Sequence, residues 1–304
     1  MISVVICTFN RAPLLRQAVE SFLAQEAMQA LDYELIVVDN NSRDDTAKVI
    51  EPFMSDPHVR YVLEPQQGLS HARNRGIAES KGDIVAFLDD DVLLDRHWLR
   101  NLDTSFNETR ADIIGGRADL LLDGPAPVWM GPKFEIWLSR VDLGPVRKPV
   151  TSGIFGLNLA FRKAALEEIG GFSPAMGRTG KTLFAGEEDA AIRAVLARGG
   201  TVIYDPDVKV QHISGSRANW RYFRRSAFDR GRQSAMEFYD SARPGRFRML
   251  KMLAGSCLSI VRQYLKAVLT LNPYKRHLIW RRIWGTVGAI RQYLQIMCGK
   301  AVSR

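Results

Sequence analysis

Short apolar runs alternate with helical patterns along the first 90 residues. The runs at residues 3–9, 33–39, 59–63 and 83–88 are almost continuously apolar. Such runs are typical of strands that are buried on both faces of a parallel sheet. The segments between them open with turn residues and continue with helical spacing. The alternation predicts an α/β fold with a mostly parallel sheet that is flanked by helices.

Polar residues follow three of these strands at the point where each strand ends. Thr8 and Asn10 follow the first strand, Asp39 and Asn41 the second, and the aspartates at 89–91 the fourth. The carboxyl ends of parallel strands meet at one edge of a sheet, where α/β proteins bind their ligands. The sequence therefore predicts a site made of residues that are far apart along the chain.

The pattern is less regular between residues 92 and 150, and further strands and helices follow. It predicts helices over 97–108, 163–169 and 187–198, and short strands over 113–116, 158–161 and 201–204. Residues 123–148 are rich in Gly, Pro and Trp. We expect a surface loop there, of the kind that often shapes a substrate pocket.

From residue 246 onward the pattern is that of two amphipathic helices separated by Asn272 and Pro273. Residues 241–304 carry 13 Lys and Arg and no acidic residue, whereas residues 1–240 carry 29 Lys and Arg against 33 Asp and Glu. The sequence thus predicts two domains, a main domain over residues 1–240 and a basic helical extension over residues 241–304.

The chain has 304 residues, of which 46% are hydrophobic and 25% charged, and this excludes disordered and collagen-like proteins. Cys7, Cys257 and Cys298 lie far apart, so we expect neither a zinc cluster nor a disulfide framework. The first residues lack the pattern of a secretory signal, and no uncharged apolar stretch reaches the ~18 residues of a spanning helix. We therefore expect a cytoplasmic protein that is held peripherally at the inner face of the cell membrane.

The adjacent carboxylates of Asp89, Asp90 and Asp91 repel one another unless water or a cation compensates their charge. Oxygen ligands of this kind suit Mg²⁺ or Mn²⁺, which keep waters and substrate phosphates as their other ligands. A solvated acidic turn is the alternative. The position directly after a buried strand, beside two other polar strand ends, favours a metal site.

A second acidic segment, formed by Glu187, Glu188 and Asp189, opens a predicted helix. Acidic residues in a first helical turn complement the helix dipole, which accounts for the segment without any catalytic role. A carboxylate at this position can also act as a general base that accepts a proton from a substrate hydroxyl. The residues alone leave both interpretations open.

His212 lies near a predicted strand and precedes a basic segment that ends at Arg232. A lone His near a strand is more often a hydrogen-bonded structural residue than a ligand, and a basic segment can be a solvated helix face. Arg and Lys beside a diphosphate would instead stabilise its negative charge.

These segments resemble family 2 glycosyltransferases of the GT-A fold over about residues 1–215. The matching pieces occur in the family's order, from VVICTFNR and ELIVVDNNSRDDT through GLSHARNRGIAESKGDIVAFLDDD, with the DxD motif, to GLNLAFRKAALEEIGGF and GEEDAAIRAVLARGGTVIYDPDVKVQH. The resemblance implies an inverting enzyme of the hexosyltransferase type. Such an enzyme would move a sugar from a nucleotide-diphosphate sugar, by default a UDP-sugar, to a hydroxyl of a glycan or lipid-linked acceptor in cell-surface polysaccharide synthesis.

The resemblance also implies roles for individual residues. Asp189 would be the catalytic base with Glu188 beside it, and Asp91 would hold Mn²⁺ or Mg²⁺, with Asp89 and His212 as further candidate ligands. The donor would be bound by Thr8, Asn10, Arg11, Asp39, Asn41, Arg73, Asn74, Asp89 and Asp90. Because both acidic segments are triplets, the register of the DxD motif and the position of the base stay ambiguous.

Two other functions stay open. A nucleotidyltransferase acting on sugar phosphates uses a similar sheet and acidic metal site, but usually carries a Gly-rich basic loop after the first strand, which TFNRAP lacks. A non-catalytic module that binds nucleotide sugars is disfavoured by the presence of both acidic segments. The QxxRW signature of processive relatives is missing, so we expect the transfer of one or a few sugars.

The helices within residues 241–304 either pack on the main domain or bind an anionic membrane surface. In the second case Lys and Arg would meet lipid headgroups, while Trp280, Trp284 and the Leu and Ile positions of the helices would enter the acyl boundary. A lipid-linked acceptor would make this placement useful. We expect no nucleic-acid partner, because the aromatic residues of this segment lie at apolar helical positions.

Overall fold

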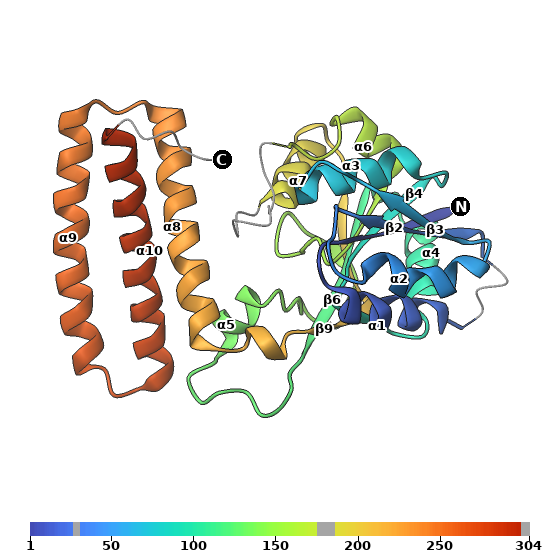
Figure 1. Cartoon of the computed structure of the whole chain (residues 1–304), viewed down its shortest axis with the longest axis horizontal. Coiled ribbons are helices and arrows are strands. Elements are labelled where there is room, and N and C mark those ends of the chain that lie inside the picture. Colours follow the sequence, from blue (N-terminus) through green and yellow to red (C-terminus); the bar gives the residue numbers. More distant parts are fainter. Residues whose placement is uncertain (27–30, 175–185, 299–304) are drawn as a thin grey trace. The chain divides into compact units, whose positions relative to one another are not determined.

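The computed structural model describes residues 1–26, 31–174 and 186–298. The chain divides into two compact units (Figure 1). The first contains Met1–Leu121, Ile136–Lys181 and Ala185–Ser214, and the second contains Leu122–Glu135 and the residues from Gly215 onward. The boundary expected at residue 240 differs from this division, which assigns residues 215–240 to the second, helical unit.

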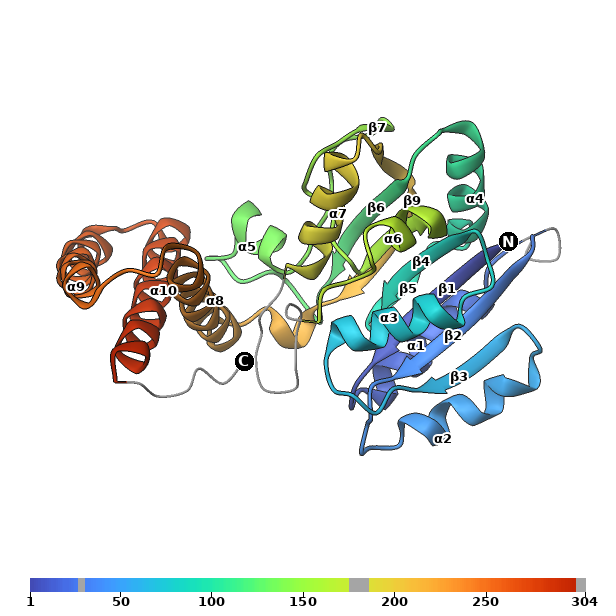
Figure 2. The same ribbon diagram turned by 90° about the horizontal axis from the view of Figure 1, so that it is seen from above.

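The first unit is built on one mixed sheet with the strand order β3-β2-β1-β4-β8-β6-β9-β5, and β7 pairs with β9 (Figure 2). The strands are β1 Ile2–Thr8, β2 Tyr33–Asp39, β3 Val59–Leu63, β4 Ile84–Asp89, β5 Val92–Leu94, β6 Ile113–Leu121, β7 Lys148–Pro149, β8 Asn158–Arg162 and β9 Val202–Ile213. β1 to β4 run parallel, β8 is antiparallel to β4 and β6, and β6 and β9 run parallel. The expected α/β fold is confirmed. Its sheet is parallel among β1 to β4 and mixed beyond them, where β5, β7 and β8 pair antiparallel with their neighbours.

The central strands are buried because they are apolar on both faces. All seven residues of β2 are buried, and β1 is buried apart from the half-buried Cys7. β9 continues to Ile213, well beyond the predicted end at residue 204. Its second half alternates buried Val208 and Val210 with exposed Asp207 and Gln211, so the continuous apolar run ends well before the strand does.

Helices cover both faces of this sheet. They are α1 Ala12–Leu23, α2 Thr46–Ile50, α3 Leu69–Glu79, α4 Trp98–Glu108, α6 Lys163–Glu168 and α7 Glu187–Ala197, and a 3₁₀ turn over Glu51–Ser55 follows α2. Figure 1 shows α3, α6 and α7 on one face and α1, α2 and α4 on the other. The sheet is therefore the middle layer of three, and its apolar strands need no further cover.

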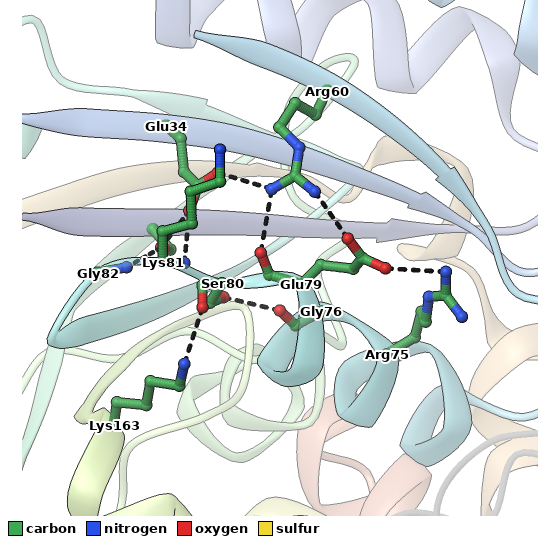
Figure 3. Close-up of polar contacts among 10 residues, drawn as sticks. Glu34, Arg60, Arg75, Gly76, Glu79, Ser80, Lys81, Gly82 and Lys163 are labelled. Atoms are coloured by element: carbon green, nitrogen blue, oxygen red, sulfur yellow. Dashed lines mark hydrogen bonds and ion pairs between the residues drawn. The ribbon is translucent and has the colours of Figure 1, made fainter.

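A polar network joins the amino ends of β1, β2 and β3 (Figure 3). The buried carboxylate of Glu34 accepts hydrogen bonds from Ser3 Oγ at 2.7 Å, from the Lys81 amide at 2.7 Å and from Arg60 at 2.9 Å. Arg60 also donates to Glu79 at 2.6 Å. Burial by itself raises the pKa of Glu34, but the hydrogen bonds outweigh it and hold the pKa below its ordinary value. The network ties the three strands to the end of α3.

The second unit contains three long helices, α8 Trp220–Ala242, α9 Arg246–Leu269 and α10 Pro273–Met297. Within this unit α10 lies between α8 and α9 and packs against both (Figure 1). The Asn219 and Asn272 side chains cap α8 and α10 by accepting from backbone amides of their first turns. The two expected amphipathic helices are present, and α8 is a further helix that the sequence showed only as a basic segment.

The expected surface loop over residues 123–148 is partly ordered by aromatic packing. Within the second unit the Trp129 ring lies 5.2 Å from the Phe134 ring, 5.7 Å from the Phe223 ring and 5.0 Å from the stacked His277 ring. Phe134 belongs to a short helix, α5 Pro132–Trp137. The loop was expected from its Gly and Pro content, which does not reveal aromatic partners that are far away in sequence.

Candidate active site

The polar strand ends meet at one edge of the sheet, as the parallel order predicts. Thr8 pairs with Asp39 in the β1–β2 register, and Cys7 pairs with Asp89 in the β1–β4 register. Three segments that are distant in sequence therefore place their last residues side by side. This edge is the carboxyl end of the parallel strands, where sheets of this class bind ligands.

Cationic and hydroxyl groups compensate the buried aspartates that follow β4. Asp90 accepts a hydrogen bond from Thr8 Oγ1 at 2.8 Å and one from Arg11 at 2.5 Å. The same Arg11 nitrogen lies 2.8 Å from Asp91 Oδ2. Burial raises the pKa of Asp90, and Arg11 and Thr8 act in the opposite direction. The repulsion expected for adjacent carboxylates is therefore partly relieved within the chain itself.

His212 faces Asp91 in the interior of the unit. Both residues are buried, and His212 Nε2 lies 3.3 Å from Asp91 Oδ1. His212 Nδ1 lies 2.7 Å from the Leu138 carbonyl oxygen, which can only accept, so Nδ1 carries the proton. The lone pair of a neutral imidazole then points from Nε2 toward the carboxylate. Such an arrangement is repulsive unless a proton or a metal cation compensates it.

The donor atoms of this pair fit a divalent cation. Two neighbouring ligands of an octahedral Mg²⁺ with bonds of about 2.1 Å lie about 3 Å apart, close to the separation of His212 Nε2 and Asp91 Oδ1. Over residues 1–26, 31–174 and 186–298 no group of three or more His, Cys, Asp or Glu could hold a metal ion. A cation here would take its other ligands from water and from a bound phosphate, as Mg²⁺ and Mn²⁺ do in phosphate-binding sites.

A buried arginine links the two acidic segments. Arg73 on α3 is 4% exposed and donates to Glu187 Oε1 at 2.8 Å. Its guanidinium also lies 3.9 Å from Asp89 Oδ1 and 3.9 Å from Glu188 Oε2. The rings of Phe87 and Phe172 pack against the same guanidinium at 5.9 and 5.2 Å. Carboxylates from residues 89 and 187–188 therefore converge on one cation.

The three acidic residues at the start of α7 have different surroundings. Glu187 is buried, Glu188 is 16% exposed at its side chain, and Asp189 is exposed. Burial raises the pKa of Glu187 to about 7, although Arg73 acts to lower it. Gly186 begins the helix with a φ of 123°, a conformation that suits glycine because it has no Cβ. The ion pair with Arg73 thus fixes Glu187 at the start of α7, and Glu188 and Asp189 follow it in the first turn of the helix.

The turn after β2 supplies the remaining candidate donor-binding residues. Asp39 is buried and accepts from the Ser42 amide at 2.9 Å and from the Tyr61 hydroxyl at 2.6 Å. Asn10 and Asn41 are exposed and adopt left-handed conformations with φ of 53° and 64°, which Asn tolerates better than most residues. Asn10 Oδ1 accepts from the Arg43 amide at 2.7 Å, so the loops after β1 and β2 are held together.

Asn74 has a different environment from the other candidate donor-binding residues. Its amide group donates to the Phe172 carbonyl and accepts from the Phe172 amide, both at 2.8 Å. Asn74 therefore joins α3 to the segment after α6, and Arg73 beside it contacts carboxylates. Their predicted contact with the donor stays a prediction.

The partners that orient His212 were not expected from the sequence. The Leu138 carbonyl fixes its Nδ1, and Ser214 Oγ lies 3.0 Å from the same nitrogen. A main-chain carbonyl 74 residues earlier leaves no signal in the sequence. Ser214 could have been noted, because it lies two positions after His212 and therefore on the same side of an extended segment.

Comparison with known proteins agrees with this geometry. Residues 3–170 match the profile of the family described as glycosyl transferase family 2. Over 225 residues the chain is 30% identical to the glucosyl-dolichyl phosphate glucuronosyltransferase of Haloferax volcanii, covering 69% of this chain and 68% of that protein. It is 37% identical over 117 residues to the GalNAc(5)-diNAcBac-PP-undecaprenol beta-1,3-glucosyltransferase of Campylobacter jejuni, covering 38% of this chain and 37% of the relative.

Solved structures share the fold at lower identity. The mannosyltransferase PcManGT from Pyrobaculum calidifontis, in complex with GDP-Man and Mn²⁺, superposes with a TM-score of 0.56 at 19% identity. The superposition covers 100% of this chain and 75% of the PcManGT chain. Residues 1–349 of S. aureus TarS in complex with UDP give a TM-score of 0.55 at 14% identity, covering 100% and 93% of the two chains. The sheet, the convergent acidic segments and the family match together show that this chain belongs to glycosyltransferase family 2 and is a glycosyltransferase of the GT-A fold.

Proposed function

We propose that this glycosyltransferase transfers one or a few sugars from a UDP-sugar to a hydroxyl of a lipid-linked or polysaccharide acceptor, with inversion at the anomeric carbon. The names of the relatives support the acceptor class, since one acts on glucosyl-dolichyl phosphate and another on an undecaprenol-linked glycan. Structural neighbours with bound UDP or GDP-Man support a nucleotide-sugar donor. The choice of UDP and the inverting course follow from the family resemblance.

One observation carries the proposal: the carboxylates of Asp89, Glu187 and Glu188 converge on the buried guanidinium of Arg73. Sugar transfer needs an anion-binding side for the leaving diphosphate and a proton-accepting side for the acceptor hydroxyl. Arg73 connects the end of β4, which leads to Asp91, with the start of α7. A nucleotide-binding module without catalysis would have no use for the second acidic segment.

The nucleotide would lie over the strand ends, with Thr8, Asn10, Arg11, Asp39 and Asn41 around it. Asp91 and His212 would hold a divalent cation, which supplies charge neutralisation for the leaving diphosphate when it is bound. The Leu138 carbonyl keeps the lone pair of His212 directed toward that position. Asp89, which is 35% exposed at its side chain, is accessible for contact with the donor.

The reaction forms a bond between the acceptor oxygen and the anomeric carbon, and breaks the bond from that carbon to the diphosphate oxygen. The proton of the acceptor hydroxyl passes to a carboxylate of α7. We assign this role to Glu188, because it lies beside the arginine that contacts Asp89, whereas Asp189 is exposed. The resemblance alone had favoured Asp189, which remains the alternative base.

The pair of variants Glu188→Gln and Asp189→Asn tests the assignment. Loss of the base should lower kcat by about 10²–10⁴-fold and leave UDP binding intact, because general-base catalysis contributes that much. Glu188→Gln should show this loss, and Asp189→Asn should stay within about tenfold of the wild type. The reverse result would move the base to Asp189. A wild-type protein that binds UDP but transfers no sugar to any member of an acceptor panel would contradict the proposed function.

Metal binding is tested separately. Titration calorimetry with Mn²⁺ in the presence of UDP should show one site that Asp91→Asn and His212→Gln each weaken by at least about tenfold, since each removes one ligand. His58→Gln is the matched control, because His58 is exposed and pairs with Asp56 at a different place in the fold. Undiminished Mn²⁺ binding by both site variants would contradict the metal assignment.

A further inference from the structure

The outward side of α9 is apolar. In this helix only Met249 and Ala267 are buried. Large apolar side chains of the helix, and that of Leu271 two residues beyond its end, are at least half exposed, namely Phe247 (71%), Leu250 (53%), Leu258 (61%), Val261 (55%), Tyr264 (50%), Leu265 (57%), Val268 (62%), Leu269 (81%) and Leu271 (93%). We call Phe247, Leu250, Leu258, Val261, Leu265 and Val268 the α9 face. Monomeric soluble proteins rarely expose a continuous apolar surface of this kind.

The α9 face is one continuous stripe. Its members recur at spacings of three and four residues, with the small Ala254 filling the gap between Leu250 and Leu258. Residues at these spacings lie on one side of a helix. The opposite side packs inside the second unit, where Ala267 joins Ile279 and Ile283 of α10 and Met249 joins Tyr293. Packing within the helical unit therefore leaves the α9 face uncovered.

Cations border the α9 face. Lys251, Arg262 and Lys266 are exposed and lie next to it on the helix, and residues 241–304 contain no acidic residue. An apolar stripe bordered by Lys and Arg is typical of helices that lie in the interface of a membrane. Over the described residues, no helix is long and apolar enough to cross a membrane.

Charge distinguishes between two occupants of this face. A second copy of the chain would bring a second set of cations against the first, with no acidic residue on α9 to pair with them. The surface of an anionic bilayer offers both an acyl region for the apolar stripe and phosphates for its cationic border. The observations thus favour lipid over self-association.

The structure also shows which apolar residues of the helical extension are most exposed. Trp280 packs between helices, with its ring 5.9 Å from that of Tyr264, and the guanidinium of Arg224 lies 5.0 Å from the ring of Trp284. Both indoles are half-buried and contribute to contacts among the helices, so their place at the acyl boundary stays a prediction. The six residues of the α9 face are each at least half exposed and are therefore better placed to enter lipid.

We propose that the α9 face docks on the surface of an anionic phospholipid bilayer. The docking holds the enzyme at a membrane without spanning it. The docking depends on α9 alone and not on the residues at the edge of the sheet. Vesicle binding and sugar transfer to a soluble acceptor can therefore fail independently of each other.

Co-sedimentation of the full chain with vesicles tests the proposal. The protein should pellet with phosphatidylcholine vesicles that contain about 30% phosphatidylglycerol, remain in solution with pure phosphatidylcholine, and be released as salt rises, because screening weakens the attraction. A polarity-sensitive label on the exposed Cys257, in a Cys298→Ser background, should shift to the blue on binding. Equal pelleting with neutral vesicles would overturn the assignment to an anionic surface.

Two triple variants separate the apolar and the cationic contributions. Neutralising three cations should lower the vesicle partition coefficient by about a hundredfold, since each cation contributes about fivefold near such a surface. The cationic variant combines Lys251→Gln, Arg262→Gln and Lys266→Gln. The apolar variant combines Leu250→Ser, Leu258→Ser and Leu265→Ser. The matched control changes the charge equally at exposed arginines of the first unit, Arg100→Gln with Arg110→Gln and Arg193→Gln, and should bind as the wild type does.

The remaining outcomes decide against the proposal. The six residues replaced in the two α9 variants are all exposed, so the thermal unfolding temperature of each variant should stay close to that of the wild type. Vesicle binding that survives both α9 variants would overturn the proposal. So would a dimer in solution that the apolar variant dissociates, combined with no vesicle binding, because the α9 face would then bind a second copy of the chain.

Discussion

A single buried arginine gives the candidate active site much of its organisation. Arg73 lies within 3.9 Å of carboxylates from the end of β4 and the start of α7, two segments about a hundred residues apart in sequence. Its positive charge is the partner that makes the burial of Glu187 tolerable. The two phenyl rings against it exclude water and strengthen these interactions.

Replacing Arg73 should therefore destabilise the protein strongly. Arg73→Met leaves the Glu187 carboxylate buried without its cation, and we expect the free energy of unfolding to fall by ~3 kcal/mol. Urea unfolding checks this, and Arg73→Met with Glu187→Gln should recover part of the loss. Arg75→Met on the same helix is the control. Its side chain is 43% exposed and pairs with Glu79 at the surface, so it should cost less than ~1 kcal/mol.

At the scale of elements, the helical unit depends on close backbone approach between α8 and α10. A Cβ at Gly288 would collide with the Phe228 carbonyl oxygen, and one at Gly231 would collide with the Gly285 carbonyl. Glycine is unfavourable inside helices, so its presence here reflects the packing of the two helices. α9 shows the opposite case, since a Cβ at Gly255 would meet open space.

These glycines predict opposite effects of the same substitution. Gly288→Ala should separate α8 from α10 and lower the free energy of unfolding by ~2 kcal/mol, because the backbone cannot yield to an added methyl group. Gly255→Ala should raise it by up to ~1 kcal/mol, since alanine has the higher helix propensity. Denaturant unfolding followed by circular dichroism measures both. Equal effects of the two substitutions would show that α8 and α10 do not meet as closely as described.

At the scale of the whole molecule, two buried carboxylates make folding stability depend on pH in opposite directions. The pKa of Glu34 is lower in the folded state than in the unfolded state. Its ionised carboxylate therefore stabilises the folded state at pH values above the unfolded-state pKa, and this stabilisation is lost as the pH falls through the folded-state pKa. The folded-state pKa of Glu187 is about 7, above its unfolded value of 4.5. The folded state then binds more protons between these values, and stability decreases as the pH rises through this range.

Unfolding free energies measured in urea from pH 4 to pH 8 should therefore show both effects. Glu187→Gln should remove the part of the decline that occurs between about pH 5 and pH 7, and Glu34→Gln should remove part of the decline toward acid. Glu168→Gln changes an exposed carboxylate and serves as the control. A wild-type profile that Glu187→Gln leaves unchanged would contradict the shifted pKa of Glu187.

Much of the first unit could be read from local patterns. The predicted bounds of the second and third strands agree with β2 and β3. A short apolar run between turn residues is typical of a strand buried in a parallel sheet, and the turn residues mark where it begins and ends. The meeting of Thr8, Asp39 and Asp89 also followed, since parallel strands bring their carboxyl ends together. β9 was predicted too short and α8 was not recognised as a long helix, because alternating and strongly charged segments carry weaker local signals.

The sequence by itself determined the sheet and the acidic residues at its edge, since these depend on spacing along the chain, and its motifs carried the resemblance to the family. Only the tertiary structure decided that Arg73 joins the two acidic segments, that the Leu138 carbonyl orients His212, and that α9 turns its apolar side outward. Each of these depends on which distant surfaces meet when the chain packs. Spacing along a helix or strand defines a face, but only packing determines whether that face is covered.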